Sequence, residues 1–558
     1  MTTTSPAPFP EDGLRKLSPK EMMQRAKALA CTLPKDNKPT CSGQVFVGIF
    51  FDGTGNNRDR DYVELPPEKR KHSNIVRLFH SYRDKWNQGY LRYYIPGVGT
   101  PFPEIGDSGT GWSSTAGSAA AWKGENRIVW GLFQLLNAPH RFVHNNALLI
   151  QPDEAKTVVG NTASSTNPGA MRRVILNTWQ DKLKAALAGK KPRVEQINLS
   201  VFGFSRGAAQ ARTFVNWLFE VCQQEDGGWT LAGIPLRLQF LGLFDTVASV
   251  GLANLYDTGV LAGHQSWADN TQEIHSAVER CVHFVAGHEV RACFPLDSVR
   301  VKSSYPGNAH EVMYPGAHSD VGGGYAPSAI GVSPTQDSFM ATIPGHDMYR
   351  EALKSGVPLV AWDMLNERFR NDLTPSSDVI RDFNAYLKDA AIGSGPVEEM
   401  ARQHMSLYFS YRFKHRAHFD QRPPCTTAPP KDQRYLRSTQ DCLIVRLSSL
   451  TPGMAVDLNV PRSVRQRIAL EPEFDPPKAA KLHEKMWKAV GMPIGTREKH
   501  VIDVAKRIDV GAVKPGVEDF FDRYVHDSMA GFIGMGMDEF KMNGIGLAKF
   551  RTVFKGDD

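Results

Sequence analysis

The sequence predicts an α/β fold in which a parallel central sheet is followed by a mostly helical C-terminal region. The run VFVGIFF at 45–51 is apolar throughout and rich in strand-forming residues, as expected for a strand buried on both faces. Helical patterns separate this run from later strand-like runs, and such alternation is typical of parallel sheets. Past about residue 345, helical patterns are interrupted by proline-rich stretches such as RPPCTTAPP at 422–430.

Apolar runs and turn residues mark the expected elements in order. The first strand stops at DGTGNN and the second stops at PGVGT. We expect strands at 45–51, 91–95, 196–202, 236–245, 282–287 and 311–316. Apolar residues at helical spacing predict helices at 21–29, 122–136, 171–187, 208–222, 348–354, 377–390 and 478–489. The chain is thereby divided into an N-terminal extension (1–43), an α/β core (44–345) and a helical region packed on that core (346–558).

Composition excludes several classes of protein. The 558 residues carry a net charge of only +7, without a long run of like charge, so nucleic-acid binding is not indicated. Seven scattered cysteines form no CxxC pair, and neither a disulfide framework nor a zinc site is expected. The N-terminus lacks the apolar stretch of a secretory signal, and no window resembles a membrane span. We therefore expect synthesis in the cytoplasm and no metal or cofactor.

A serine lies between two glycines directly after one of the expected strands. The sequence GFSRG at 203–207 fits the pattern G-x-S-x-G, with a strand before it and a helix after it. In a nucleophile elbow this turn is so sharp that side chains two residues before and after the serine would collide. The turn lifts the hydroxyl to a helix N-terminus, where backbone N–H groups stabilise an oxyanion. The pattern predicts that Ser205 is a nucleophile, with an ordinary glycine-rich turn as the alternative.

A serine nucleophile needs a base, and the base needs an acid that orients it. In α/β hydrolases the acid and then the histidine follow the serine along the chain, each at the end of a strand. Asp245 closes the strand at 236–245, although it could instead cap the next helix. His318 follows the strand at 311–316 in a glycine-rich loop. We predict a triad of Ser205, Asp245 and His318.

Other titratable residues are weaker candidates. His310 precedes the last strand and is the second candidate for the base. Asp320 is the reserve acid, but its spacing of two residues from His318 suits a role in bracing the loop. His283 and His288 come too early in the chain and are expected to be packing or polar core residues.

The loop after the first strand, DGTGNN at 52–57, is a candidate for part of the oxyanion hole. Backbone N–H groups of Gly53 and Thr54 would act with that of Arg206, and each such donor contributes roughly 3 kcal/mol to transition-state stabilisation. A phosphotransferase would need an acid two residues before Asp52, where this chain has Phe50. A plain tight turn remains the alternative.

Five motifs in a fixed order resemble one protein family. They are FFDGTGNN, PGVGT, GFSRGAAQAR, FDTVASVG and PGAHSDVGGGY, and they span about residues 44–326. They resemble the α/β-hydrolase domain family that contains the first group of bacterial type VI secretion lipase effectors. This resemblance implies an α/β-hydrolase core with nucleophile Ser205, acid Asp245 and base His318. The acid follows the serine by only 40 positions, one strand earlier than in a standard α/β hydrolase.

The resemblance also implies a function. The expected activity is that of an antibacterial phospholipase A, which hydrolyses carboxylic esters of membrane glycerophospholipids at the sn-1 or the sn-2 position. A VgrG-like spike protein would carry the chain into the periplasm of a rival cell, and an immunity lipoprotein would protect the producer. Two alternatives stay open: a cytoplasmic serine esterase for small soluble esters, and an inactive hydrolase fold that serves as a binding module. The intact triad argues against the second.

Two features near the C-terminus have their own interpretations. The segment 529–547, rich in Met, Gly, Phe and Ile, is expected to be a buried helix, or else an adaptable surface that touches acyl chains. It partly overlaps the segment VHDSMAGF at 525–532, which resembles the same family more weakly than the five motifs do. The triplet at 526–528, His-Asp-Ser, imitates a catalytic set, but adjacent residues do not converge on one point.

Overall fold

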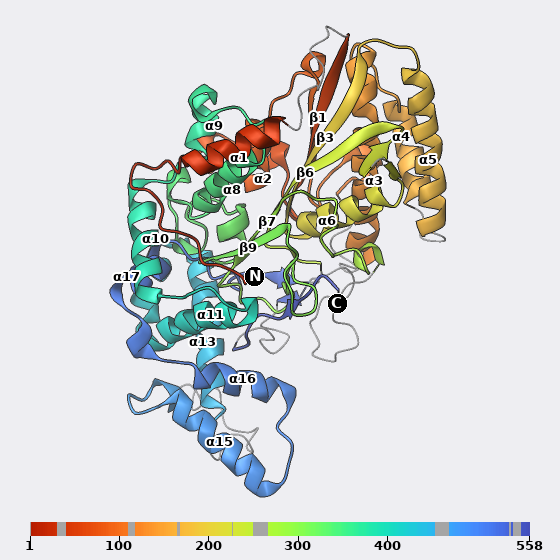
Figure 1. Ribbon diagram of the computed structural model, residues 1–558. Coiled ribbons are helices and arrows are strands. Elements are labelled where there is room, and N and C mark those ends of the chain that lie inside the picture. The colour runs from red at the N-terminus through yellow and green to blue at the C-terminus, as the bar shows by residue number, and fades with distance from the viewer. Residues whose placement is uncertain are drawn as a thin grey trace.

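The computed structural model confirms the predicted α/β fold. It describes residues 2–30, 41–109, 118–163, 168–225, 227–248, 266–451, 468–534, 537–538 and 548–557. Six parallel strands lie side by side in the order β2-β1-β3-β6-β7-β9 (Figure 1). Their bounds are Tyr90–Ile95 (β2), Ser42–Phe51 (β1), Arg193–Phe204 (β3), Ile234–Phe244 (β6), Cys281–Ala286 (β7) and Ala309–Tyr314 (β9). Short antiparallel strands β4 (Gln223–Glu225) and β5 (Gly228–Leu231) extend the sheet beside β6.

Helices cover both faces of the sheet, as buried parallel strands require. On one face lie α3 (Ser118–Val143), α4 (Pro152–Thr162), α5 (Pro168–Leu187) and α6 (Arg206–Phe219), seen at the right of Figure 1. The other face is covered by α2 (Asn74–Ser81) and α8 (Thr342–Lys354). Successive residues of β1 point to opposite faces: Val47 and Ile49 pack with α3 and α6, while Phe50 packs with α2.

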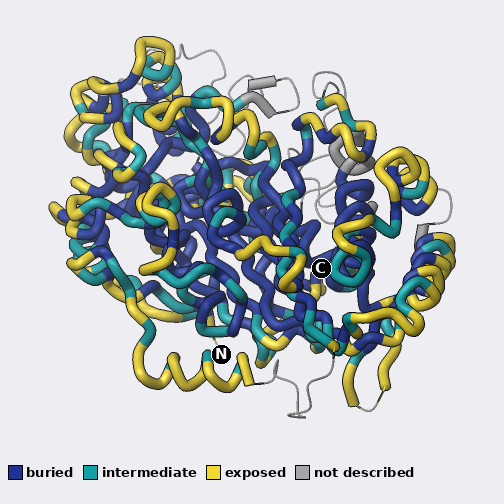
Figure 2. The backbone as a smooth tube through the Cα atoms, turned by 90° about the horizontal axis from the view of Figure 1, so that it is seen from above, coloured by how far each residue is buried: buried dark blue, intermediate teal, exposed yellow. Residues whose placement is uncertain are grey.

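The C-terminal helices continue the core on the α2–α8 side. They include α10 (Ser377–Ala390), α11 (Val397–Lys414), α13 (Pro430–Ser448) and α17 (Pro515–Arg523). Their buried side chains belong to the same apolar cluster as those of β7, β9 and α8. Figure 2 shows this buried interior ringed by exposed backbone. The region after residue 345 is therefore part of the same hydrophobic core rather than a separate body.

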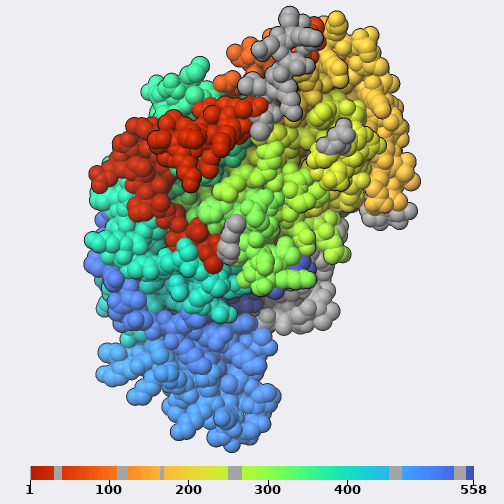
Figure 3. All heavy atoms as spheres, viewed as in Figure 1, coloured from red at the N-terminus to blue at the C-terminus, as the bar shows by residue number. Residues whose placement is uncertain are grey.

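Two of the C-terminal helices project to the bottom of the molecule in Figure 1, and their inner faces still belong to the same apolar cluster. The pair α15 (Pro476–Val490) and α16 (Thr496–Lys506) forms a lobe at the bottom of Figure 3. The remaining α-helices among the described residues are α1 (Pro19–Ala30), α7 (His318–Gly322), α9 (Glu367–Asn371) and α12 (Pro423–Thr427). Among the described helices, none combines the length and the apolar character needed to cross a bilayer.

The segments near both ends of the described chain pair with strands of the core. Near the N-terminus, Thr4 pairs in parallel with Val312, so the edge strand β9 is covered by residues predicted to be a mere extension. Near the C-terminus, β12 (Val553–Phe554) pairs in parallel with β8 (Leu296–Asp297). Both ends are thus tied to the core.

The expected helix at 529–547 is wrong for the residues that the structure describes there. Instead, β10 (Ile533–Gly534) pairs antiparallel with β11 (Met537–Asp538). Residues 535–536 and 539–547 lie outside the described residues. The segment contains five glycines, each of which disfavours a helix by about 1 kcal/mol relative to alanine.

Candidate active site

Ser205 occupies the sharp turn between β3 and α6. Its backbone angles are φ 59° and ψ −127°, a conformation that a non-glycine residue adopts only under strain. A Cβ on Gly203 would lie 2.5 Å from the carbonyl oxygen of Gly207, and one on Gly207 would lie 2.4 Å from that of Asp52. Both flanking glycines are therefore required by close contacts. The Ser205 residue is 4% exposed.

Asp245 lies at the end of the strand next to that of the serine. Phe204 is paired with Phe244, so the residues that follow them, Ser205 and Asp245, leave the sheet at the same edge. The Val247 N–H donates to the Ser205 carbonyl oxygen at 3.3 Å, which holds the loop after Asp245 against the elbow. This adjacency brings Asp245 next to the elbow, although it lies one strand earlier than the acid of a standard α/β hydrolase.

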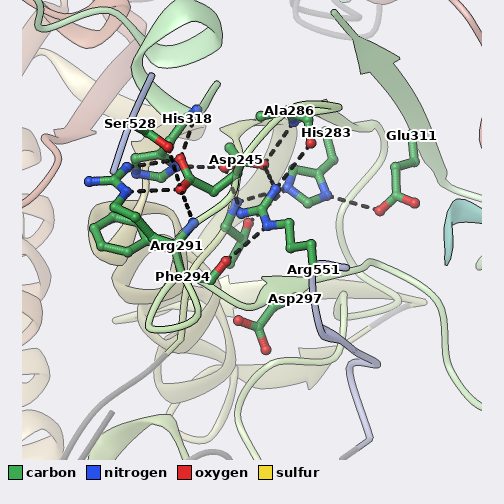
Figure 4. Close-up of polar contacts among 12 residues, drawn as sticks. Asp245, His283, Ala286, Arg291, Phe294, Asp297, Glu311, His318, Ser528 and Arg551 are labelled. Atoms are coloured by element: carbon green, nitrogen blue, oxygen red, sulfur yellow. Dashed lines mark hydrogen bonds and ion pairs between the residues drawn. The ribbon is translucent and has the colours of Figure 1, made fainter. Parts of the chain in front are cut away.

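His318 begins α7, which follows β9, and it contacts the acid directly. Its Nδ1 lies 2.5 Å from Oδ2 of Asp245 (Figure 4). The ring packs against that of Phe204, with centroids 4.7 Å apart, which brings it beside the elbow. Since Nδ1 binds the acid, Nε2 is the nitrogen left to accept a serine proton. His310, in contrast, lies at the opposite end of β9.

The described contacts include no hydrogen bond between the Ser205 hydroxyl and the His318 ring. Phe204, which precedes Ser205 in the chain, packs its ring against that of His318. In unliganded enzymes such catalytic hydrogen bonds are often long and tighten when substrate binds. The arrangement therefore holds Asp245 and His318 in contact and places Ser205 at the end of the strand next to that of Asp245.

Burial and charge set the protonation of the acid–base pair. Burial alone would raise the pKa of Asp245, but the Arg551 guanidinium and the hydrogen bond with His318 hold that pKa well below its usual range. Burial lowers the pKa of His318, and the contact with Asp245 only partly opposes this. An ionised acid beside a neutral imidazole is the state that a general base requires.

The loop after β1 lies next to the elbow but does not present every predicted donor. The Gly53 N–H donates to Oδ1 of its neighbour Asp52 at 2.7 Å, so it is committed elsewhere in this conformation. Thr54 remains close, because its Oγ1 accepts a hydrogen bond from Nε of Arg206 at 2.5 Å. The sequence pattern could not reveal this internal competition for the Gly53 N–H.

The Asp52 side chain holds this loop in place through hydrogen bonds. Its fully buried carboxylate also accepts hydrogen bonds from the hydroxyls of Ser73 and Tyr94, both at 2.6 Å. Burial raises the pKa of Asp52 to about 6 despite these three donors. The PGVGT motif packs on the same loop, since a Cβ on Gly97 would lie 1.7 Å from the Gly53 carbonyl oxygen.

The C-terminal segment braces the loop that carries His318. The Nδ1 of His526 lies 2.5 Å from Oδ1 of Asp320. The Ser528 hydroxyl donates to Glu289 at 2.8 Å, and Glu289 also accepts the His318 backbone N–H at 3.2 Å (Figure 4). His526 and Ser528 therefore brace this loop, whereas Asp527 contacts Arg412 and Thr439 instead. Asp320 has the bracing contacts expected of it.

Sequence reasoning missed Arg551, which contacts the acid from the last described segment of the chain. Its Nη1 and Nη2 each lie 2.8 Å from an oxygen of Asp245. No motif surrounds Arg551, and 306 positions separate the two residues, so no sequence signal could have paired them. His283 is the buried core residue expected from the sequence, and it contacts Glu311 and Thr246. The described residues contain no group of three or more side chains arranged to hold a metal ion.

Much of the chain matches one known protein family. The model of the catalytic domain of Tle1-like phospholipase effectors of the type VI secretion system (T6SS) matches residues 47–222 and 223–351, more than half of the chain. The chain belongs to this family. As a Tle1-like phospholipase effector it is a hydrolase, and its family is secreted by the T6SS. No curated protein matches it.

Two solved structures are similar to this Tle1-like chain. An uncharacterised protein from Pseudomonas aeruginosa is 24% identical, with a TM-score of 0.73 over 100% of this chain and 85% of its own. This likeness supports the fold. The structure of the Tle1 effector bound to the VgrG spike is also 24% identical, with a TM-score of 0.30 over 52% of this chain and 53% of its own.

Proposed function

We propose that the chain is a serine phospholipase of the A type, which hydrolyses carboxylic esters of membrane glycerophospholipids at the sn-1 or the sn-2 position. The observation that carries the proposal is the strained Ser205 elbow beside the bonded pair of His318 and Asp245. Membership of a phospholipase effector family supports the substrate class.

The geometry suggests how each residue acts. The Ser205 hydroxyl attacks the ester carbonyl carbon while Nε2 of His318 takes its proton, and Asp245 stabilises the resulting imidazolium. Backbone N–H groups of Arg206, at the start of α6, and of Thr54 donate to the oxyanion. As the tetrahedral intermediate collapses, the bond between its carbon and the alcohol oxygen breaks, and His318 protonates that oxygen so that the lysophospholipid leaves as an alcohol.

A second half-reaction frees the enzyme. Water attacks the acyl carbon of the acylated Ser205, and its proton passes to His318. The second tetrahedral intermediate then releases the fatty acid, and His318 returns the proton to the serine oxygen. In the overall reaction, one ester and one water molecule give one alcohol and one fatty acid. Apart from water, every catalytic group in these steps is a side chain or a backbone group of the chain.

The activity is tested most simply on lipid vesicles. We expect purified protein to release lysophospholipid and fatty acid from vesicles that contain phosphatidylethanolamine and phosphatidylglycerol. Separate labels on the two acyl chains identify the position that is cut. Ser205→Ala should lower the rate by at least about 10⁴-fold, because the remaining site retains only binding and oxyanion contacts.

Matched variants sharpen this test. Ser319→Ala removes a hydroxyl next to His318 that has no catalytic role here, and it should keep wild-type activity. Turnover of short soluble esters alone would favour a soluble esterase, and no turnover of either class would favour a silent binding module. Vesicle hydrolysis that survives Ser205→Ala would contradict the proposed mechanism.

For delivery, we propose that a VgrG-like spike protein carries the chain into the periplasm of a target cell and that an immunity protein protects the producer. Family membership among T6SS effectors supports this route. Expression with an added export signal should reduce viable counts by several orders of magnitude, whereas cytoplasmic expression and exported Ser205→Ala should not. Equal toxicity of exported wild type and exported Ser205→Ala would show that killing does not depend on ester hydrolysis, and would refute the proposed action in the periplasm.

A further inference from the structure

Arg551 is buried against the triad acid. Its side chain is 1% exposed, and its two terminal nitrogens each donate to one carboxylate oxygen of Asp245 at 2.8 Å (Figure 4). Nε donates to the Phe294 carbonyl oxygen at 2.9 Å, and Nη1 also donates to that of Ala286 at 3.2 Å. A guanidinium that binds a carboxylate through two parallel bonds fixes both its plane and its position.

The segment around Arg551 is itself pinned. The Leu296 N–H donates to the Thr552 carbonyl oxygen at 2.9 Å, and the Ser298 N–H donates to that of Phe554 at 3.0 Å. These bonds form the β8–β12 ladder directly after Arg551. The guanidinium is therefore held in place by backbone on one side and by the carboxylate on the other.

The contacts of Asp245 are divided between its two oxygens. Oδ1 accepts hydrogen bonds from Arg551 and from the Ala286 N–H, and Oδ2 accepts from Arg551 and from His318. Rotation of the carboxylate away from His318 would break both guanidinium bonds. A single backbone N–H on Oδ1 could not prevent that rotation.

We propose that Arg551 is a positioning residue of the active site, which holds the Asp245 carboxylate in the orientation that His318 needs. Arg551 contacts neither the substrate nor the reacting atoms, so it acts through Asp245. The inference rests on the proposed serine hydrolase function and deepens it. It makes the C-terminal segment, outside the matched catalytic domain of residues 47–351, a part of the active site.

The charge of Arg551 has a second consequence. A cation on the far side of Asp245 weakens the attraction between that carboxylate and a protonated His318. Its removal should favour the imidazolium, so that His318 stays protonated up to a higher pH. The other titratable groups around the pair are unchanged by this substitution. Glu289 and Arg291 act on His318 directly, and the surrounding loops carry His283, Asp297, Asp320 and His526.

The test compares three variants of the full chain in a soluble-ester assay between pH 4.5 and 9. In Arg551→Met, we expect kcat to fall at least about 30-fold with KM within about threefold, and the acidic limb of kcat/KM to move up by roughly one pH unit. Arg551→Lys keeps the positive charge but cannot form the two parallel bonds to Asp245. The acidic limb of its kcat/KM profile should therefore match that of wild type, while its kcat falls. Arg172→Met removes another buried, ion-paired arginine, which contacts Glu220 at the far end of α6. It should lower the thermal midpoint without moving the pH profile.

Two results would overturn the inference. One is a folded Arg551→Met enzyme with wild-type kcat and pH profile. The other is a wild-type kcat in Arg551→Lys, which would show that the two parallel bonds of the guanidinium are dispensable. This second result decides the question if Arg551→Met does not fold. Ser205→Ala in the same assay separates the two proposals: if it is fully active, the hydrolase mechanism fails, whereas an inactive Ser205→Ala beside unaffected Arg551 variants refutes the positioning role alone.

Discussion

His318→Ala is expected to lose nearly as much esterase activity as Ser205→Ala, at least about 10⁴-fold in kcat/KM. The reason is that the serine, base and acid act as a unit, so that loss of the base leaves a hydroxyl with no proton acceptor. The double variant should be little worse than either single one. Initial rates with a soluble ester for the three variants and wild type measure this directly.

His310→Ala is the matched control for the base. His310 is a histidine of the same strand–loop unit, at the opposite end of β9 from His318, and it makes no contact with Asp245 in the described structure. This variant should retain most activity. A nearly active His318→Ala enzyme, or losses from Ser205→Ala and His318→Ala that multiply in the double variant, would contradict the assigned base.

A chain that ends at residue 351, where the matched catalytic domain stops, is expected to be inactive and largely insoluble. Loss of residues 352–558 would expose the apolar side of β7, β9 and α8, on which Phe383, Tyr386 and Phe521 pack in the full chain. Removal of one buried aromatic side chain costs about 3–5 kcal/mol, and a whole domain is stable by only about 5–15 kcal/mol. The truncation would also remove Arg551 and His526.

Soluble yield, near-UV circular dichroism and thermal unfolding would measure this outcome. Coexpression of residues 352–558 as a separate chain should restore a soluble complex, because the two parts share one core. A truncated chain that unfolds cooperatively and hydrolyses esters at the wild-type rate would show that the C-terminal region is dispensable.

The sequence predicted those parts of the molecule that depend on local patterns. Ser205, Asp245 and His318 were predicted as a triad because each follows a strand and is marked by a short motif, and adjacent parallel strands bring such residues to one edge. The alternation of buried strands and helices likewise predicted the sheet. These features need only neighbouring residues to be recognised.

The remaining features depend on contacts between distant segments. Arg551 and His526 reach the triad from the end of the chain, and nothing in their sequence neighbourhood indicates a partner. The Gly53 N–H was predicted to face the oxyanion, but the adjacent Asp52 side chain accepts it. The N-terminal residues around Thr4 were assigned to an extension because the edge of β9, which they cover, is not visible in the sequence.

Covalent labelling with a fluorophosphonate tests most directly the central claim that Ser205 is the nucleophile. Such a probe reacts with a serine activated by a neighbouring base, and mass spectrometry of the digested protein locates the adduct. We expect one adduct, on Ser205, that forms quickly in wild type, slowly in His318→Ala and not at all in Ser205→Ala. An adduct that persists in Ser205→Ala, or one found on another serine of the wild type, would contradict the claim.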